Sequence, residues 1–221
     1  NPIPVPKTFK EPEKPVPVPV ERTGRPYTFK ERKLTASELE YWQQYGITSE
    51  ILEQYKVCSV VQFQSENADG NPFSYSSTKE EPIYGYKNKR FIKLYRPFSK
   101  TRFLYGGNIG ESYCFGLEQL PSKGDTLFIT GGEKDVLSLA AKGFHAICFN
   151  SETVTVPPNI IYKLTFRFKH IILLYDMDAT GIESAKKHEK QLCEYGVKRL
   201  LLPLQGTKTE KDISDYFRAG N

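Results

Sequence analysis

Carboxylate side chains gather in short stretches of the second half of the chain. Asp176 and Asp178 stand one residue apart after the apolar run HIILLY, and Glu133 and Asp135 follow the run TLFIT. A fifth carboxylate, Asp212, follows Lys211. Burying a charge costs several kcal/mol unless a partner compensates it. An apolar run that ends in two carboxylates therefore needs a compensating group.

A divalent cation is the compensating group that these residue types favour. Carboxylates gathered at one edge of a sheet repel one another unless a cation lies among them, and Mg²⁺ commonly bridges one or two carboxylates to substrate phosphates. The sharper interpretation is a Mg²⁺ or Mn²⁺ site for phosphoryl or nucleotidyl chemistry. The alternative for Glu133 and Asp135 is structural, because acidic residues favour the first turn of a helix.

The elements that position these residues alternate regularly. Strands are predicted at 125–130, 145–149, 170–176 and 197–203, and helices at 133–142 and 181–196. Strands that alternate with helices indicate a parallel sheet covered on both faces. Ligands of such sheets bind beyond the carboxyl ends of the strands. We therefore predict an α/β fold with Asp176 and Asp178 at the functional edge.

The first half of the chain has a different organisation. Eight of the fifteen prolines lie within residues 1–26, which predicts an extended proline-rich linker over residues 1–33. Residues 34–122 contain two short helical patterns and then several short strands joined by turns, which indicates a small α+β unit. The parallel sheet would occupy residues 123–221. Because the chain begins with Asn1 and a linker, we expect it to be a segment of a longer protein.

Residues 84–107 interleave basic and aromatic side chains. Cations neutralise phosphates and aromatic rings stack on bases, so this composition suits single-stranded nucleic acid. The alternative is a strand pair with buried rings and solvated charges. Beside an acidic site that handles polyanions, nucleic-acid binding is favoured. The candidate contacts to template or nucleotide are Lys93, Arg96, Lys100, Arg102, Lys134 and Lys211.

Composition excludes several classes. The chain has 221 residues, 38% of them hydrophobic, with a net charge of +5, which suits a globular protein and permits a nucleic-acid partner. It shows no apolar run long enough to span a bilayer and no signal peptide, so we expect a cytoplasmic protein without a membrane partner. The four cysteines form no C-x-x-C pair, so a zinc ribbon is disfavoured and reduced core thiols are expected.

Two stretches, LFITGGEKDVLSLAAKG and IILLYDMDATGIESAKK, resemble the Toprim domain, the metal-binding fold of bacterial-type primases, topoisomerases and some nucleases. The likeness extends upstream. LEYWQQYGITSEILEQYKV, FIKLYRPFSKTRFLY and SYCFGLEQLP are similar to successive parts of the primase RNA-polymerase region. The resemblance covers about residues 34–217 and implies the primases of bacteria and phages, including those fused to replicative helicases.

The resemblance implies roles for individual residues. Asp176 and Asp178 match the two Toprim aspartates that hold Mg²⁺, while Asp135 and Asp212 match the acidic residues of the first and the late motif. The chain departs from the family at Gly131, where relatives carry a glutamate used for acid/base work or metal support. Three consequences stay open: Glu133 substitutes for it, catalysis is weakened, or catalysis is lost.

Three functions follow from the resemblance. The first is a DNA primase core, a nucleotidyltransferase that would use Mg²⁺ or Mn²⁺ to make short RNA primers from ribonucleoside triphosphates on single-stranded DNA. It would work with a replicative helicase or with fused domains. The second is a catalytically weakened Toprim module that binds nucleic acid, suggested by Gly131. The third is a Toprim nuclease.

Overall fold

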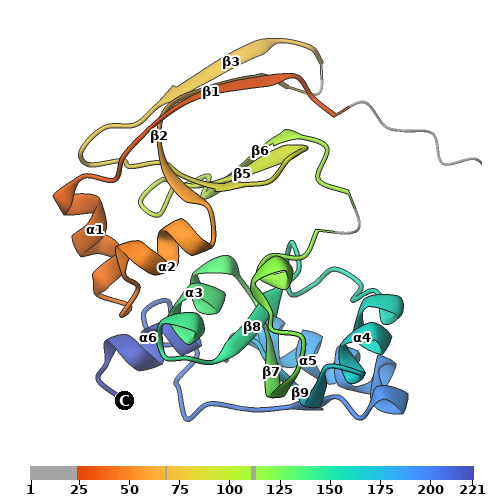
Figure 1. Ribbon diagram of the computed structural model, residues 1–221. Helices are drawn as coiled ribbons and strands as arrows, with labels where there is room; N and C mark the ends of the chain where they lie inside the picture. Colours follow the sequence, from red (N-terminus) through yellow and green to blue (C-terminus); the bar gives the residue numbers. More distant parts are fainter. Residues whose placement is uncertain (1–23, 68, 111–112) are drawn as a thin grey trace, which may run out of the picture.

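The computed structural model describes residues 24–67, 69–110 and 113–221. In these ranges the first half of the chain forms an antiparallel sheet and the second half a parallel sheet covered by helices (Figure 1). Most of the predicted linker, residues 1–23, lies outside the described residues. Among the described residues, no helix combines the length and the apolar character needed to cross a membrane.

The antiparallel sheet has the order β1-β2-β4-β5-β6, and β3 pairs with β2. The predicted linker, residues 1–33, extends too far, because residues 27–32 form β1 and pair with β2. Tyr27 and Phe29 alternate along β1 and pack on the buried cluster of this sheet, which a tether would not do. The strands are β1 (Tyr27–Arg32), β2 (Val57–Glu66), β3 (Pro72–Ser76), β4 (Tyr84–Lys87), β5 (Phe91–Tyr95) and β6 (Phe103–Gly107).

Two short helices, α1 (Ala36–Gln43) and α2 (Ser49–Gln54), separate β1 from β2. Thr35 caps α1 through a capping box with Glu38, and Thr48 caps α2. Both caps satisfy backbone donors that a helix start leaves unpaired. The caps fix where each helix begins and so direct Trp42, which is fully buried, into the core.

The parallel sheet has the order β10-β9-β7-β8, with every pairing parallel. Its last strand is shorter than predicted, because the apolar run at 197–203 leaves the sheet after Arg199, and Leu200 and Leu201 are 44% and 51% exposed. The strands are β7 (Gly124–Thr130), β8 (His145–Cys148), β9 (Phe168–Leu174) and β10 (Lys198–Arg199). The helices are α3 (Glu133–Ala141), α4 (Pro158–Thr165), α5 (Ala179–Gln191) and α6 (Ile213–Arg218), with 3-10 turns at Leu117–Gln119 and Cys193–Tyr195.

Apolar packing covers both faces of the parallel sheet, as predicted. Residues of α4 and α5 contribute to one buried cluster, and residues of α3 and α6 contribute to another. The second cluster also contains Trp42, Tyr86 and Tyr95 from the first half of the chain. The two predicted units are therefore joined by a shared hydrophobic core. Of the four cysteines, Cys193 is exposed, which the expectation of core thiols missed.

Candidate metal centre

Three carboxylates from distant parts of the sequence meet at the carboxyl edge of the parallel sheet. Asp135 lies in the first turn of α3, Asp176 follows β9, and Asp212 is the residue before α6. One oxygen from each lies within 4.8 Å of the others. Oxygen atoms at this spacing suit a small divalent cation such as Mg²⁺ or Mn²⁺.

Local structure and helix packing fix two of these side chains. The Asp212 carboxylate caps α6 by accepting the N–H of Asp215 at 2.8 Å. Asp135 accepts hydrogen bonds from the hydroxyl and the N–H of Ser214 in α6. Because α3 packs against α6, these bonds bring Asp135 and Asp212 together across 77 residues of sequence.

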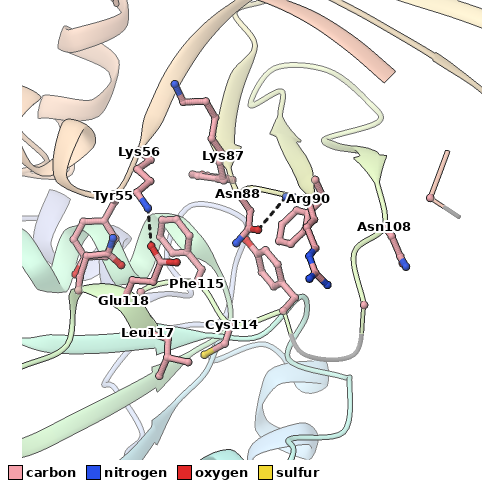
Figure 2. A pocket seen from close by; sticks show the side chains of 17 residues that line it. Tyr55, Lys56, Lys87, Asn88, Arg90, Asn108, Cys114, Phe115, Leu117 and Glu118 are labelled. Carbon is pink, nitrogen blue, oxygen red and sulfur yellow. Dashed lines mark hydrogen bonds and ion pairs between the residues drawn. The ribbon is translucent and has the colours of Figure 1, made fainter. Parts of the chain in front are cut away.

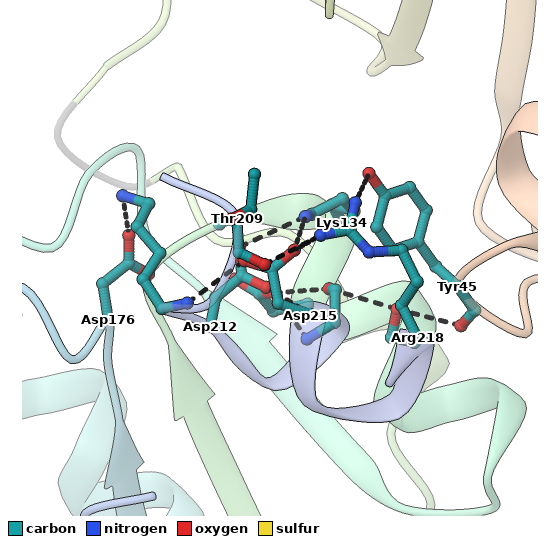
Figure 3. A network of polar contacts seen from close by, with 12 residues as sticks. Tyr45, Lys134, Asp176, Thr209, Asp212, Asp215 and Arg218 are labelled. Atoms are coloured by element: carbon teal, nitrogen blue, oxygen red, sulfur yellow. Dashed lines mark hydrogen bonds and ion pairs between the residues drawn. The ribbon is translucent and has the colours of Figure 1, made fainter. Parts of the chain in front are cut away.

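The three carboxylates repel one another in a partly dry environment. Burial and then Asp212 raise the pKa of Asp135 well above its usual value, although Lys134 opposes the rise. Burial also raises the pKa of Asp176, and Lys211 opposes it. Two lysines share the compensation. Lys134 lies 3.2 Å from Asp212 (Figure 3), and Lys211 forms an ion pair with Asp176.

Asp178, a predicted metal ligand, lies beside the group of three rather than in it. Its carboxylate caps α5 by accepting the N–H of Gly181 at 3.0 Å, and it forms an ion pair with Lys211 at 3.0 Å. Burial alone would raise the pKa of Asp178, but the Gly181 N–H and Lys211 lower it below its usual value. The structure therefore gives Asp178 a capping role.

Glu133, a predicted catalytic residue, points into the interface with the antiparallel sheet. Its carboxylate accepts hydrogen bonds from Lys93 at 2.6 Å and from the Tyr113 hydroxyl at 2.7 Å. Residues two apart on a helix point about 200° apart, so Glu133 and Asp135 face different partners. Glu133 lies outside the group of three, and its contacts do not support the idea that it substitutes for a glutamate at 131.

The predicted nucleic-acid contacts divide into buried and exposed residues. Lys93 forms an ion pair with Glu133, and its side chain is only 3% exposed. Arg96 is buried over the Tyr75 ring. Neither side chain is exposed to nucleic acid, contrary to the prediction. Lys100 and Arg102 are exposed. Lys134 and Lys211 lie at the acidic edge as ion-pair partners.

Glu152 lies at the same edge, and our sequence interpretation missed it. It follows β8, and one of its carboxylate oxygens is buried without a hydrogen-bond partner among the described residues. Burial, followed by the charges of Asp176 and Asp178, raises its pKa to about 7. The sequence did contain a signal for Glu152, because this residue follows the strand predicted at 145–149. Asp215, which contacts Arg218 and Lys134, was also missed.

A pocket of about 530 Å³ opens elsewhere, beside the turn that begins at Leu117, and none of the acidic residues at the sheet edge lines it (Figure 2). Its two lysines are neutralised, because Lys56 pairs with Glu118 at 2.6 Å and Lys87 pairs with Glu31 at 2.7 Å. The pocket therefore offers less free positive charge than its composition indicates, and the acidic edge is the better candidate site.

The region that contains the three carboxylates is similar to a known protein family. Residues 128–217 match a family model described as Toprim-like. This segment is therefore similar to the Toprim-like family, as predicted. No curated protein matches the chain significantly.

Solved primase structures share the fold. The primase fragment of the bacteriophage T7 primase-helicase has a TM-score of 0.54 and 18% identity over 87% of this chain and 70% of its own. A DNA primase domain from Pseudomonas aeruginosa has a TM-score of 0.60 and 17% identity over 82% and 67%. A DnaG primase catalytic domain bound to single-stranded DNA has a TM-score of 0.59 and 17% identity over 84% and 68%. The chain thus has the fold of primase catalytic cores, which confirms the predicted fold class.

Proposed function

We propose that this chain is the polymerase core of a DNA primase, which makes short RNA primers on single-stranded DNA by metal-dependent nucleotidyl transfer. The observation that carries the proposal is the convergence of Asp135, Asp176 and Asp212 at the carboxyl edge of a Toprim-like sheet. The shared fold with primase cores supports the reaction class. Ribonucleoside triphosphates and a DNA template are the implied substrates.

The residues present fit a divalent cation. All three groups are carboxylates, the donors that Mg²⁺ and Mn²⁺ prefer, and burial of Asp135 beside Asp212 and Asp176 raises its pKa, as expected where negative charge lacks full compensation. When bound, the cation would neutralise triphosphate charge and activate the attacking hydroxyl. Lys134 and Lys211 already contact this edge, so we assign them the binding of substrate phosphates.

Nucleic acid would bind along β6 and the segment before it. Arg102, Phe103 and Tyr105 are exposed there, with Phe103 at 37% and Tyr105 at 40%. Rings and a guanidinium suit bases and phosphates of a single strand. Arg102, the residue before β6, also interacts electrostatically with Asp212, which supports binding of nucleic acid near the acidic edge.

A second function deserves a test because Glu133 is occupied by Lys93 and Tyr113, and Gly131 carries no carboxylate. A chain with this pair of features would bind nucleic acid but polymerise poorly. A nuclease that uses the same carboxylates is the third possibility, and product analysis separates all three.

The experiment is template-directed RNA synthesis by the full chain with Mg²⁺ or Mn²⁺. We expect wild-type protein to make short RNA and Asp176→Asn to reduce the rate by at least about a hundredfold, because loss of metal ligation removes several kcal/mol of transition-state stabilisation. Asp125→Asn is the matched control, since Asp125 is exposed at the opposite edge of the sheet. Template binding without RNA would indicate the binding module, and template cleavage without RNA would indicate the nuclease.

A further inference from the structure

Gly131 leaves a space at the acidic edge that another side chain uses. A Cβ atom placed on residue 131 would lie 3.0 Å from Oε2 of Glu152 and 3.1 Å from Oδ1 of Asp176. From these two distances, the two carboxylate oxygens lie no more than about 6 Å apart. The backbone at Gly131 does not have the positive φ that would require glycine. Space, rather than backbone conformation, explains the glycine.

Strand order explains how Glu152 reaches this position. In the parallel sheet β7 lies between β8 and β9. Glu152 follows β8, Asp176 follows β9, and Gly131 follows β7 between them. A side chain at residue 131 would thus stand in the path from Glu152 to Asp176. Its absence lets a carboxylate from the β8 loop approach the metal centre across the end of β7.

The Glu152 carboxylate has a backbone hydrogen bond with Asp176, but this bond does not occupy both of its oxygens. Its Oε2 atom is buried and has no hydrogen-bond partner among the residues that the structure describes. A buried carboxylate oxygen without a partner loses its hydration without compensation. By contrast, the buried Glu133 carboxylate is held by Lys93 and Tyr113. The Oε2 atom of Glu152 is therefore available to ligate a cation.

We propose that Glu152 is a metal-ligating residue, which supplies from the β8 loop the carboxylate that residue 131 lacks. Asp176 would be the shared ligand, because it lies near Asp135 and Asp212 and also near Glu152. This inference rests on the proposed function, because it assigns a further ligand to the same metal centre. It also explains Gly131 without a loss of activity, because the glycine leaves room for the Glu152 carboxylate.

The first test measures Mn²⁺ binding by the full chain, read from the electron paramagnetic resonance signal of free Mn²⁺. Glu152→Gln keeps the shape of the side chain and removes its charge. We expect it to weaken Mn²⁺ binding at least tenfold, since changing even an outer partner of a metal ligand costs about 10- to 100-fold. Glu194→Gln, an exposed position beyond α5, is the matched control. Equal Mn²⁺ affinity in these two folded variants would overturn the proposal.

The second test moves the carboxylate. In Gly131→Glu/Glu152→Ala the new side chain enters the space that Glu152 has vacated, so we expect Mn²⁺ affinity to rise at least severalfold above that of Glu152→Ala alone. Circular dichroism and thermal unfolding would confirm that the variants are folded. Recovery of affinity would show that the two positions serve one metal centre.

The two proposals fail in different ways. If wild-type protein makes RNA and Glu152→Gln changes neither RNA yield nor Mn²⁺ affinity, the role of Glu152 is wrong and the primase assignment stands. If wild-type protein makes no RNA but loses Mn²⁺ affinity in Glu152→Gln, the ligand assignment stands and the reaction is wrong.

Discussion

At the scale of single residues, Glu133, which we predicted to be catalytic, forms a buried ion pair with Lys93. The two side chains are 3% and 1% exposed and lie 2.6 Å apart. Lys93 belongs to β5 and Glu133 to α3, so the pair crosses the interface between the two sheets. Removing one partner of a buried pair leaves a charge without compensation, which costs more than the pair itself contributes.

Glu133→Gln should therefore lower the free energy of unfolding by about 3–5 kcal/mol. The measurement is urea unfolding at neutral pH, followed by circular dichroism. Glu118→Gln is the control, because Glu118 forms an ion pair with Lys56 in which both side chains are more than half exposed, and such pairs contribute about 1 kcal/mol or less. Similar costs for the two variants would contradict a structural role for Glu133.

At the scale of elements, the start of α1 depends on Glu38. This residue is 4% exposed, and its carboxylate accepts hydrogen bonds from the Thr35 N–H, the Arg32 guanidinium and the Ser59 hydroxyl. Burial alone would raise the pKa of Glu38, but these three partners lower it below its usual value. The carboxylate therefore stabilises the fold in its ionised form and ties α1 to β1 and β2.

Glu38→Gln should lower the free energy of unfolding by about 1–3 kcal/mol at pH 7, since hydrogen bonds to charged groups are of this size. Because the pKa is lowered in the folded state, this stabilisation is present above the unfolded pKa of about 4.3 and is lost as the pH falls toward the folded value. Urea unfolding of both proteins at pH 7 and at pH 3.5 measures this loss. If the difference in free energy of unfolding between wild type and variant is the same at both pH values, the prediction is wrong.

At the scale of the whole molecule, one buried cluster couples the antiparallel sheet to the parallel sheet. Trp42 and Tyr86 pack in it with Val136 of α3 and Leu174 of β9. A shared core of this kind resists relative motion of the two parts, so β6 stays in place relative to the acidic edge. A template bound along β6 would be presented to the carboxylates without a large rearrangement.

Arg102→Gln should weaken binding of single-stranded DNA and lower the slope of log K against log salt concentration by about 0.7, the value for one phosphate contact on a single strand. Fluorescence anisotropy of a labelled oligonucleotide over a salt series measures both quantities. Lys169→Gln is the control, because the Lys169 side chain is 76% exposed at the far edge of the sheet. An equal slope for the two variants would remove Arg102 from the binding surface.

The sequence by itself determined the local elements and the residues placed at their ends. Local patterns predicted α3 and the strands β7 to β9 to within two residues at each end, because these signals depend on neighbours within a few residues. The same reasoning placed Asp176 at the carboxyl end of a strand, where it lies. The predicted linker and the predicted last strand were both too long. Composition alone does not show whether a short segment pairs with a sheet or stays exposed to solvent.

Only the tertiary structure decided which carboxylates share a site. Asp135 joins the group because Ser214, 79 residues away, holds it, whereas Glu133 two residues earlier faces Lys93. Glu152 lies near Asp176 across the end of β7, which separates β8 from β9 and is followed by Gly131. A side chain's direction on a helix or loop depends on which face packs against the sheet, and contacts between distant segments set that choice.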